Sequence, residues 1–330
     1  MKKQIYVIMA TYNGEKYVEE QIDSILKQTY KNIKLVISDD CSKDNTRKIL
    51  QKYEKEDERV EVYYQEKNLG CIKNFEFLLS KVQSEIFMFS DQDDVWLPEK
   101  IEKTYEKMQK EQADLVFGDL EVVDKNLNTI YKSYNDFMKL SDKIKKTINT
   151  KEFSYLYNLV TGCTMMVKSK WIKEFNPLPE KNKYVLHDHW ISLIISLNGK
   201  VAYVPEKYIK YRQHGDNEVG VDKISHHFNK FEQVRNHFID VKIGVFGVYV
   251  QNKEKFPKEM QKTNQEVYDY FKMLKTKNKI NFRGWNIFYR IYKNEKKLYY
   301  LENFIIMNTP CLGKILFKIR YAILKALKRR

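Results

Sequence analysis

The sequence predicts an α/β protein with a mainly parallel sheet flanked by helices, followed by a helical C-terminal extension. Three observations predict this fold class. Apolar runs typical of strands alternate with segments of helical spacing through residues 4–112. The first run, residues 4–10 (QIYVIMA), is nearly continuous and rich in Ile and Val, as a strand buried on both faces should be. After about residue 221 strand signals fade, and long polar–apolar stretches favour helices.

The N-terminal part alternates four strands with four helices. Strands are predicted at residues 4–10, 33–37, 60–64 and 85–89. Helices are predicted at residues 15–28, 44–55, 72–82 and 98–112. Asp44 is suited to cap the second helix, and Pro98 suits the first position of the fourth. This βαβαβαβα order implies right-handed crossovers and a three-layer arrangement.

The segment from residue 114 to residue 220 is more mixed. Short strands are expected at residues 115–117, 163–167, 201–204 and 208–211. A helix is expected at residues 188–197, with Gly199 as its C-terminal stop. We therefore expect one α/β domain at residues 1–220 and a helical region at residues 221–330. Pro257 and Pro310 should break helices in the second region.

Composition narrows the classes of protein. The 330 residues include 59 Lys and Arg against 44 Asp and Glu, so the net charge of +15 indicates a polyanionic partner. Nucleic acid, an anionic membrane and phosphate-bearing ligands all fit that charge. The cysteines are widely spaced without a C-x-x-C pair, which argues against a zinc site or disulfide framework and indicates a cytoplasmic protein. No apolar stretch reaches the roughly 18–20 residues that a transmembrane helix needs, and the N-terminal run is too short for a signal peptide.

Small, polar and acidic residues follow four successive predicted strands. The segments are residues 11–15 (TYNGE), 38–46 (SDDCSKDNT), 68–70 (NLG) and 90–96 (SDQDDVW). In an open α/β sheet, ligands bind beyond the carboxyl ends of the strands, so these segments should converge on one rim. Individually each segment also fits a turn, a cap or a solvated loop; their order on successive strand ends favours a site.

Three carboxylates lie within four residues after the fourth strand: Asp91, Asp93 and Asp94. Such carboxylates repel one another unless a cation or protons neutralise them. Mg²⁺ and Mn²⁺ prefer hard oxygen ligands and phosphate oxygens, so either ion would also neutralise a leaving diphosphate. Asp40 is suited to accept the imide N–H of a uracil or thymine ring, which Thr11 and Tyr12 would flank.

In order and spacing these segments resemble the family 2 glycosyltransferases, over residues 4–215. The resemblance implies the glycosyltransferase A fold, a UDP- or dTDP-linked sugar donor, inversion at the anomeric carbon, and Mn²⁺ or Mg²⁺. Three further motifs are similar to the subgroup described as rhamnosyltransferases, which makes dTDP-rhamnose one implied donor. They are residues 161–165 (TGCTM), 187–190 (HDHW) and 211–215 (YRQHG).

The resemblance also implies roles for individual residues. Asp188 matches the catalytic base, and Asp93 matches the main metal ligand, with Asp91 and His214 beside it. The implied nucleotide-sugar contacts are Thr11, Tyr12, Asn13, Glu15, Asp40, Asn68, Gly70, Lys73, Asn74, Asp91 and Gln92. The implied acceptor contacts are Thr161, Gly162, His187 and Trp190.

Several of these positions have a second interpretation or depart from the pattern. Asp188 could serve only as the N-cap of its helix, and Trp190 could belong to the core. His214 could be structural, although its neighbour Arg212 suggests a loop that faces a diphosphate. Gln92 and His187 stand where many members of the family carry other residues, which leaves the donor preference open.

The last residues, 312–330, are basic and contain no acid. Their apolar residues share one helical face and the Lys and Arg residues lie opposite, as in a helix that lies on an anionic membrane. A helix packed on the catalytic domain fits the same pattern. Membrane contact at the inner face of the cell membrane would suit a lipid-linked or glycan acceptor in surface polysaccharide synthesis.

Other functions predict features that this sequence lacks. A sugar-phosphate nucleotidyltransferase should carry a Gly-rich phosphate loop after the first strand, and residues 11–15 are not one. A nucleic-acid-binding protein should carry positive charge where this rim concentrates acids. We therefore expect no nucleic-acid partner.

Overall fold

The computed structural model describes residues 3–151, 153–179, 184–215, 231–276 and 286. These residues fall into two compact units. The first holds the described residues up to 179 together with 186–215. The second holds Tyr184, Val185 and the described residues from 231 onward. The predicted boundary at residue 220 lies outside the described residues.

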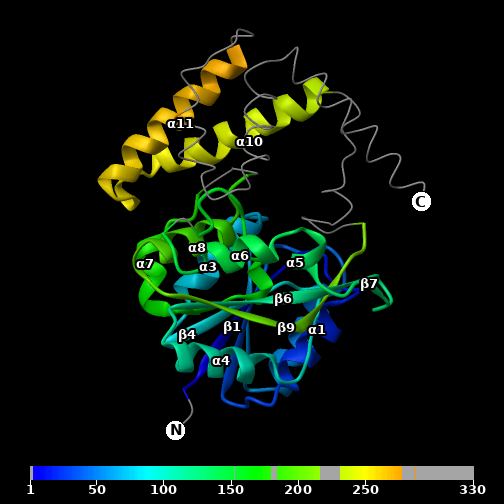
Figure 1. Ribbon diagram of the computed structural model, residues 1–330. Helices are drawn as coiled ribbons and strands as arrows, with labels where there is room; N and C mark the ends of the chain where they lie inside the picture. The colour runs from blue at the N-terminus through cyan, green and yellow to red at the C-terminus, as the bar shows by residue number, and fades with distance from the viewer. Residues whose placement is uncertain (1–2, 152, 180–183, 216–230, 277–285, 287–330) are drawn as a thin grey trace, which may run out of the picture. The chain divides into compact units, whose positions relative to one another are not determined.

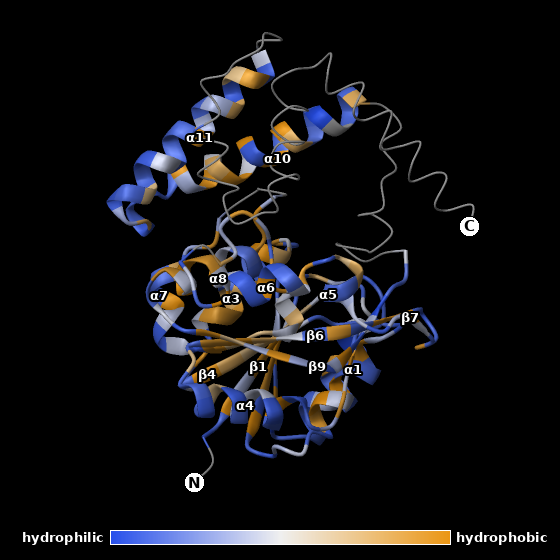
Figure 2. Cartoon of the chain, in the orientation of Figure 1, coloured by the Kyte–Doolittle hydropathy of each residue, from blue (hydrophilic) through white to orange (hydrophobic). Residues whose placement is uncertain are grey.

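The first unit is built on one sheet (Figure 1). Its first half is parallel, in the order β3-β2-β1-β4. The bounds are β1 Ile5–Thr11, β2 Ile33–Asp39, β3 Val60–Tyr64 and β4 Ile86–Ser90. These four strands confirm the predicted ones, with ends that differ by at most two residues. The β4 residues and nearly all of β1 are buried, because helices cover both faces of the central strands (Figure 2).

The second half of the sheet mixes strand directions. Its strands are β5 Val95–Trp96, β6 Leu115–Val123, β7 Thr129–Tyr131, β8 Met166–Lys168 and β9 Val201–Arg212. Strand β8 runs antiparallel to β4 and β6, whereas β9 runs parallel to β6 and antiparallel to β5. Strand β7 is an antiparallel partner of β6.

Two predictions in this half were wrong. The strands expected at residues 201–204 and 208–211 are one strand, β9, which passes Pro205 by a register shift between the pairs Gly118–Val204 and Asp119–Lys207. A bulge of this kind lets a strand tolerate a proline. The strand expected at residues 163–167 is instead a 3-10 turn, η1 Gly162–Thr164, followed by β8.

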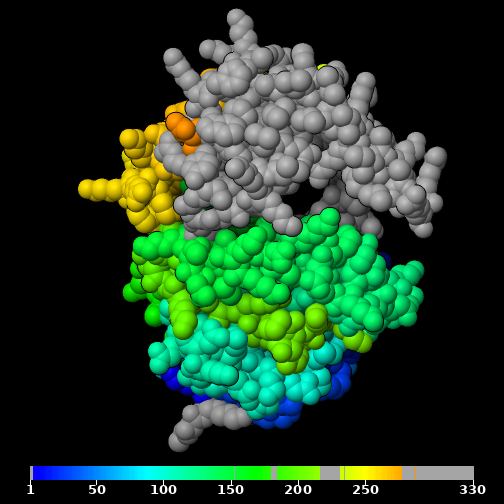
Figure 3. All heavy atoms as spheres, viewed as in Figure 1, coloured from blue at the N-terminus to red at the C-terminus, as the bar shows by residue number. Residues whose placement is uncertain are grey.

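Helices cover both faces of the sheet, with α3 and α8 on one side and α4 on the other (Figure 1). The long helices are α1 Val18–Leu26, α2 Thr46–Glu56, α3 Cys71–Ser80, α4 Lys100–Glu111 and α8 His187–Asn198. Short turns of helix are α5 Tyr134–Phe137, α6 Ser141–Thr147, η2 Ser169–Trp171 and α7 Ile172–Phe175. Helix α4 and strand β9, far apart in sequence, border one another on the face shown in Figure 3.

Helix α8 confirms the predicted helix to within one residue at each end, but the residues at its ends act differently from the expected caps. Its N-cap is Leu186, so Asp188 lies inside the first turn and is not the cap. Gly199 follows the helix, but its φ of −116° is not left-handed. A Cβ at Gly199 would lie 2.5 Å from Trp171 Cζ2, so close packing and not left-handed geometry explains the glycine.

The second unit is a pair of helices, α10 Phe231–Gln251 and α11 Lys258–Thr276, joined through η3 Lys253–Lys255. Pro257 separates η3 from α11, as predicted. Asp240 and Lys275 form an ion pair at 2.8 Å between the two helices. These helices confirm the C-terminal helical extension; Pro310 and the basic segment 312–330 lie outside the described residues. Within the described chain, no helix has both the length and the apolar character required to cross a membrane.

Candidate active site

The loop after β1 is fixed to the loop after β2 by Asn13 and Glu15, two residues that were predicted to contact the nucleotide sugar. Asn13 Oδ1 accepts a hydrogen bond from Lys43 N at 2.9 Å, and Glu15 Oε2 accepts one from Asn45 N at 2.9 Å. Under this contact Asp39 is fully buried and accepts a hydrogen bond from Arg47 Nε at 2.6 Å. Asn13 and Glu15 therefore join two loops at the rim of the sheet.

Gln92 holds the main chain of Tyr12. Tyr12 N donates to Gln92 Oε1 at 2.9 Å, and Gln92 Nε2 donates to Tyr12 O at 3.0 Å. The Tyr12 ring remains 46% exposed, whereas Thr11 is buried with its hydroxyl 3.4 Å from Asp39 Oδ1. Of the two residues expected to flank a nucleobase, the structure presents the Tyr12 ring to solvent.

Asp40 follows β2 and meets the loop after β3. Its carboxylate accepts hydrogen bonds from Leu69 N at 2.6 Å and Gly70 N at 2.8 Å, while Asn68 Nδ2 donates to its carbonyl at 3.3 Å. Gly70 has a φ of 81°, a conformation that favours glycine. The structure thus brings together the predicted residues Asp40, Asn68 and Gly70.

The two remaining predicted donor contacts lie on α3. Asn74 is buried and donates through Nδ2 to Ser38 O at 2.9 Å, which ties α3 to the end of β2. Lys73 is partly exposed and pairs with Glu76 at 2.8 Å.

The loop at residues 90–96, here called the acidic loop, divides its carboxylates between two sets of partners. Asp93 Oδ2 lies 2.7 Å from His214 Nε2, so the structure joins two of the predicted metal contacts. Arg212, which suggested from the sequence a loop that faces a diphosphate, has its own polar groups bound within the protein. It is buried, and its Nε donates to Asp93 O at 2.8 Å.

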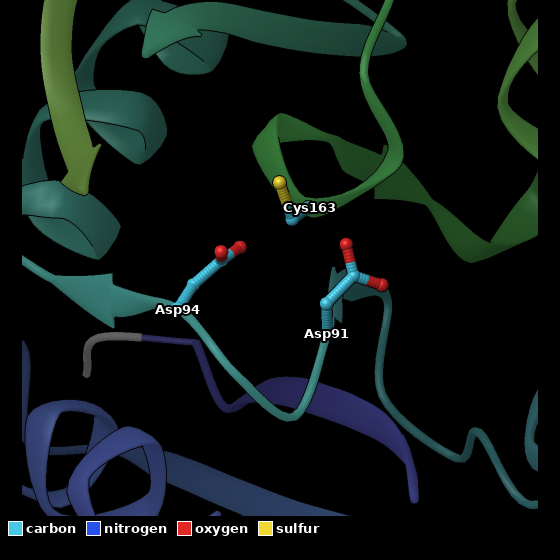
Figure 4. Close-up of side chains that lie close together, drawn as sticks. All are labelled: Asp91, Asp94 and Cys163. Carbon is cyan, nitrogen blue, oxygen red and sulfur yellow. The ribbon is translucent and has the colours of Figure 1, made fainter. Parts of the chain in front are cut away.

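The other two carboxylates converge on a thiol. Ligand atoms of Asp91, Asp94 and Cys163 lie within 4.8 Å of one another, and both carboxylates point toward the sulfur (Figure 4). Burial, reinforced by repulsion from Asp93 and Asp91, raises the pKa of Asp94 well above its usual range. Burial also raises the pKa of the Cys163 thiol and lowers that of the Lys100 ammonium, which lies 3.0 Å from the centre of the Trp96 ring.

The acidic loop offers a fitting donor set for Mg²⁺ or Mn²⁺. Both ions prefer carboxylate oxygens, and three carboxylates are present within four residues. Asp94 Oδ2 is buried and has no hydrogen-bond partner among the described residues, as expected where an acidic site lacks a counter-charge. The protonated Cys163 thiol is a poor ligand for such hard ions, so the oxygen ligands are the relevant ones.

Asp188 stands beside this cluster. Its Oδ1 accepts hydrogen bonds from Asn158 Nδ2 at 3.0 Å and from His189 N at 2.7 Å, and its Oδ2 accepts one from Gly162 N at 3.2 Å. Gly162 precedes Cys163, whose sulfur contacts the acidic loop, so residues 162–163 connect the predicted base to the predicted metal ligands. The Asp188 carboxylate is oriented by three donors.

The predicted acceptor residues occupy different surroundings. Gly162 lies against His187, since a Cβ there would lie 2.6 Å from His187 Nε2. The His187 ring packs on Phe75 and Phe89, with centroids at 4.7 and 5.2 Å. Thr161 caps the η1 turn. Trp190 is fully buried and donates to Phe175 O at 2.8 Å, so it belongs to the core and not to an acceptor site.

Three residues near these groups were not predicted from the sequence. Asn158 bonds Asp188, and Tyr17 stacks on His214 with ring centroids 4.7 Å apart. The third is Tyr134: burial, together with the charge of Asp188, raises the pKa of its phenol to about 12. No local pattern marks these residues, because only the fold brings them to the site.

Comparison with known proteins identifies the class. The family model described as Glycosyl transferase family 2 matches residues 6–175. Residues of this chain are 30% identical over 222 positions to an uncharacterized glycosyltransferase of Rickettsia typhi, covering 65% of this chain and 67% of that protein. The dTDP-rhamnosyl transferase RfbG of Shigella flexneri is 30% identical over 226 residues, covering 65% of this chain and 74% of that protein. The teichuronic acid biosynthesis glycosyltransferase TuaG of Bacillus subtilis, a putative assignment, is 39% identical over 116 residues, covering 35% of this chain and 46% of that protein.

Solved structures agree on the fold. S. aureus TarS residues 1–349 in complex with UDP-GlcNAc superimposes with a TM-score of 0.54 at 17% identity, covering 92% of this chain and 79% of that one. The mannosyltransferase PcManGT of Pyrobaculum calidifontis, in complex with GDP-Man and Mn²⁺, gives 0.55 at 13% identity, covering 100% and 81%. The architecture is that of a glycosyltransferase A enzyme. The chain belongs to glycosyl transferase family 2.

Proposed function

We propose that this protein transfers one sugar, with inversion, from a nucleoside diphosphate sugar to an acceptor hydroxyl, with a divalent metal and Asp188 as base. One observation carries the proposal. Residues far apart in the sequence meet at the carboxyl ends of the parallel strands, where Asp188 reaches the acidic loop through Gly162 and Cys163. Family membership favours this reaction over the sugar-phosphate nucleotidyltransferase.

The donor would lie along the loops that follow β1, β2 and β3. Tyr12 presents an exposed ring on which a nucleobase can stack, and Asp40 has the acceptor oxygens for a pyrimidine N–H. The Leu69 and Gly70 N–H groups fix the Asp40 carboxylate in place, so its orientation exists before the ligand binds. A pyrimidine such as the base of UDP or dTDP suits this arrangement.

The diphosphate would lie at the acidic loop. A bound Mn²⁺ or Mg²⁺ would neutralise the charge that develops on the leaving diphosphate. Asp93 and Asp91 would hold that ion, and His214, already bonded to Asp93, would complete this side of the site. The complex of PcManGT with Mn²⁺ supports a divalent ion for the fold without fixing which ion this chain uses.

Asp188 would remove the proton from the attacking hydroxyl. Asn158, His189 N and Gly162 N fix the direction of its carboxylate, as general base catalysis requires. The acceptor would approach past Thr161, Gly162 and His187. Inversion follows when the base and the leaving diphosphate act on opposite faces of the sugar.

The names of relatives support a narrower role. RfbG is a dTDP-rhamnosyl transferase and TuaG is assigned to teichuronic acid biosynthesis, so we propose a donor such as dTDP-rhamnose and a role in surface polysaccharide synthesis. The basic segment 312–330 would bring the enzyme to a glycan or lipid-linked acceptor at the inner face of the cell membrane.

Calorimetric titration with UDP-, dTDP- and GDP-linked sugars, each with and without Mn²⁺, tests the proposed sugar donor and its dependence on the metal. We expect a UDP- or dTDP-sugar to bind only when Mn²⁺ is present, and Asp93→Ala to abolish that dependence together with most activity. Equal binding with and without Mn²⁺, in the wild type, would contradict the metal assignment. Product analysis by NMR then reports whether the anomeric configuration inverts.

A further inference from the structure

Three side chains form a stack that ends at the Asp93 carboxylate. The Arg212 guanidinium carbon lies 4.6 Å from the centre of the Tyr17 ring. The other neighbour of Tyr17 is the His214 ring, 4.7 Å away between centroids and inclined by 32°. His214 Nε2 in turn lies 2.7 Å from Asp93 Oδ2.

Arg212, at the far end of the stack, is immobilised from several directions. Its Nε donates to Asp93 O and its Nη1 to Lys125 O, both at 2.8 Å, and its Nη2 pairs with Glu20. The guanidinium is planar, so these contacts also fix the plane against which the Tyr17 ring rests.

Tyr17 lies near the start of the sequence, far from its two neighbours Arg212 and His214, and it is fixed by its own helix. It is the N-cap residue of α1, and its main-chain N–H donates to Gly14 O at 3.0 Å. The Tyr17 ring therefore stands on a fixed element and contacts both the Arg212 guanidinium and the His214 imidazole.

His214 follows β9, and its imidazole contacts the Tyr17 ring. Contact with an aromatic face restricts the plane of the ring, and here that plane aims Nε2 at Asp93. We propose that Tyr17 is a positioning residue of the metal and diphosphate side of the site, acting through the orientation of the His214 ring; this inference rests on the proposed function. The Arg212 guanidinium, itself fixed by hydrogen bonds, also contacts the Tyr17 ring.

The stack predicts which feature of Tyr17 matters. No hydrogen bond involves the Tyr17 hydroxyl in the part of the chain that the structure describes, so the ring face carries the effect. Tyr17→Phe keeps that face and Tyr17→Leu removes it, which gives a matched pair of variants at one position.

The test measures Mn²⁺ binding by electron paramagnetic resonance of the full-length protein with UDP, which needs no turnover. We expect wild type and Tyr17→Phe to bind Mn²⁺ equally, and Tyr17→Leu to bind about 3- to 10-fold more weakly, the size of effect typical of one aromatic contact. Thermal melting of the metal-free variants checks that each is folded; should Tyr17→Leu fail to fold, Tyr17→Met replaces it.

A double-mutant cycle shows whether the effect passes through the imidazole. In a His214→Gln background, Tyr17→Leu should cause no further loss of affinity. Equal Mn²⁺ affinities for Tyr17→Leu and Tyr17→Phe, or full additivity with His214→Gln, would overturn the inference alone. Absence of Mn²⁺ binding by the wild type would instead overturn the proposed metal site, and the inference with it.

Discussion

Asp188 is the side chain whose replacement should separate chemistry from donor binding. In Asp188→Asn the amide keeps one acceptor oxygen, so it cannot accept from Asn158 and from Gly162 on two separate oxygens, and the side chain can no longer take a proton. We expect turnover to fall about 10²- to 10⁴-fold, the range typical of a general base. Donor affinity, measured by calorimetry, should stay within about twofold of wild type.

Asp142→Asn is the matched control, because this carboxylate is exposed on α6. It should leave both quantities unchanged. Turnover of Asp188→Asn near the wild-type rate would show that another group removes the proton.

Gly162 is a residue whose missing side chain shapes the site. A Cβ there would lie 2.6 Å from His187 Nε2, and His187 is confined by Phe75 and Phe89. Gly162→Ala should therefore cost about 1–3 kcal/mol in the free energy of unfolding, measured by urea denaturation. Gly118→Ala on β6, where the nearest atom lies at an ordinary 3.5 Å, should cost less than Gly162→Ala.

At the scale of residues the sequence shows which chemistry is present but not which side chains orient it. Asp40 and Asp93 follow predicted strands and Asp188 begins a predicted helix, so their positions could be expected from local patterns. Asn158 contacts Asp188, which lies 30 positions further along the chain, and Tyr17 contacts His214, which lies far along the chain as well. For Trp190 the sequence left two possibilities, an acceptor contact or a core residue. The structure buries its side chain completely, so it belongs to the core.

The loops that follow β1 and β2 depend on one buried carboxylate. Asp39 accepts hydrogen bonds from Arg47 Nε, Ser42 N and the Ser42 hydroxyl. Asp39→Ala should cost about 2–4 kcal/mol, since it leaves these donors without a partner in a buried position. Urea denaturation measures this loss.

An exposed ion pair gives the control for that prediction. Glu106 pairs with Lys103 at 2.9 Å on the surface of α4, and both side chains are about half exposed. Glu106→Ala should change stability by less than about 1 kcal/mol. Equal losses in the two variants would mean that Asp39 does not organise the loops.

Local patterns predicted the parallel half of the sheet better than the mixed half. The first four strands are buried runs bounded by turn residues, and their bounds could be read almost directly. Strand β9 was divided in two because Pro205 is a strong local break, whereas the register shift beside it depends on β6. The predicted strand 163–167 included part of the η1 turn because residues 163–167 form one buried run, of which only Met166 and Val167 pair in the sheet.

For the molecule as a whole, the charge distribution along the chain leads to a prediction about its location. In the segment 312–330 the Lys and Arg residues and the apolar residues are spaced as the sequence of an amphipathic helix would be, and no acid is present. Deleting it should abolish sedimentation with liposomes that contain anionic lipid, because both the electrostatic attraction and the buried apolar face are lost. The wild type should not pellet with neutral phosphatidylcholine liposomes, and pelleting that survives the deletion would refute the membrane role.

The class of fold and the rim that carries the site could both be predicted, because sheet topology follows from the order of elements and ligands gather at strand ends. The way in which the three carboxylates of the acidic loop divide between two sets of partners could not be predicted. Asp93 turns to His214 while Asp91 and Asp94 turn to Cys163, and that division is set by contacts with β9 and η1, which lie far along the chain.

The amide of Gln92 satisfies both polar groups of the Tyr12 peptide, so the path of this loop does not depend on the side chain at position 12. If the Tyr12 ring stacks on the nucleobase as proposed, this position contributes to donor affinity without contributing to the path of the loop. Exchanges at residue 12 should then change how tightly the nucleotide binds without weakening the fold.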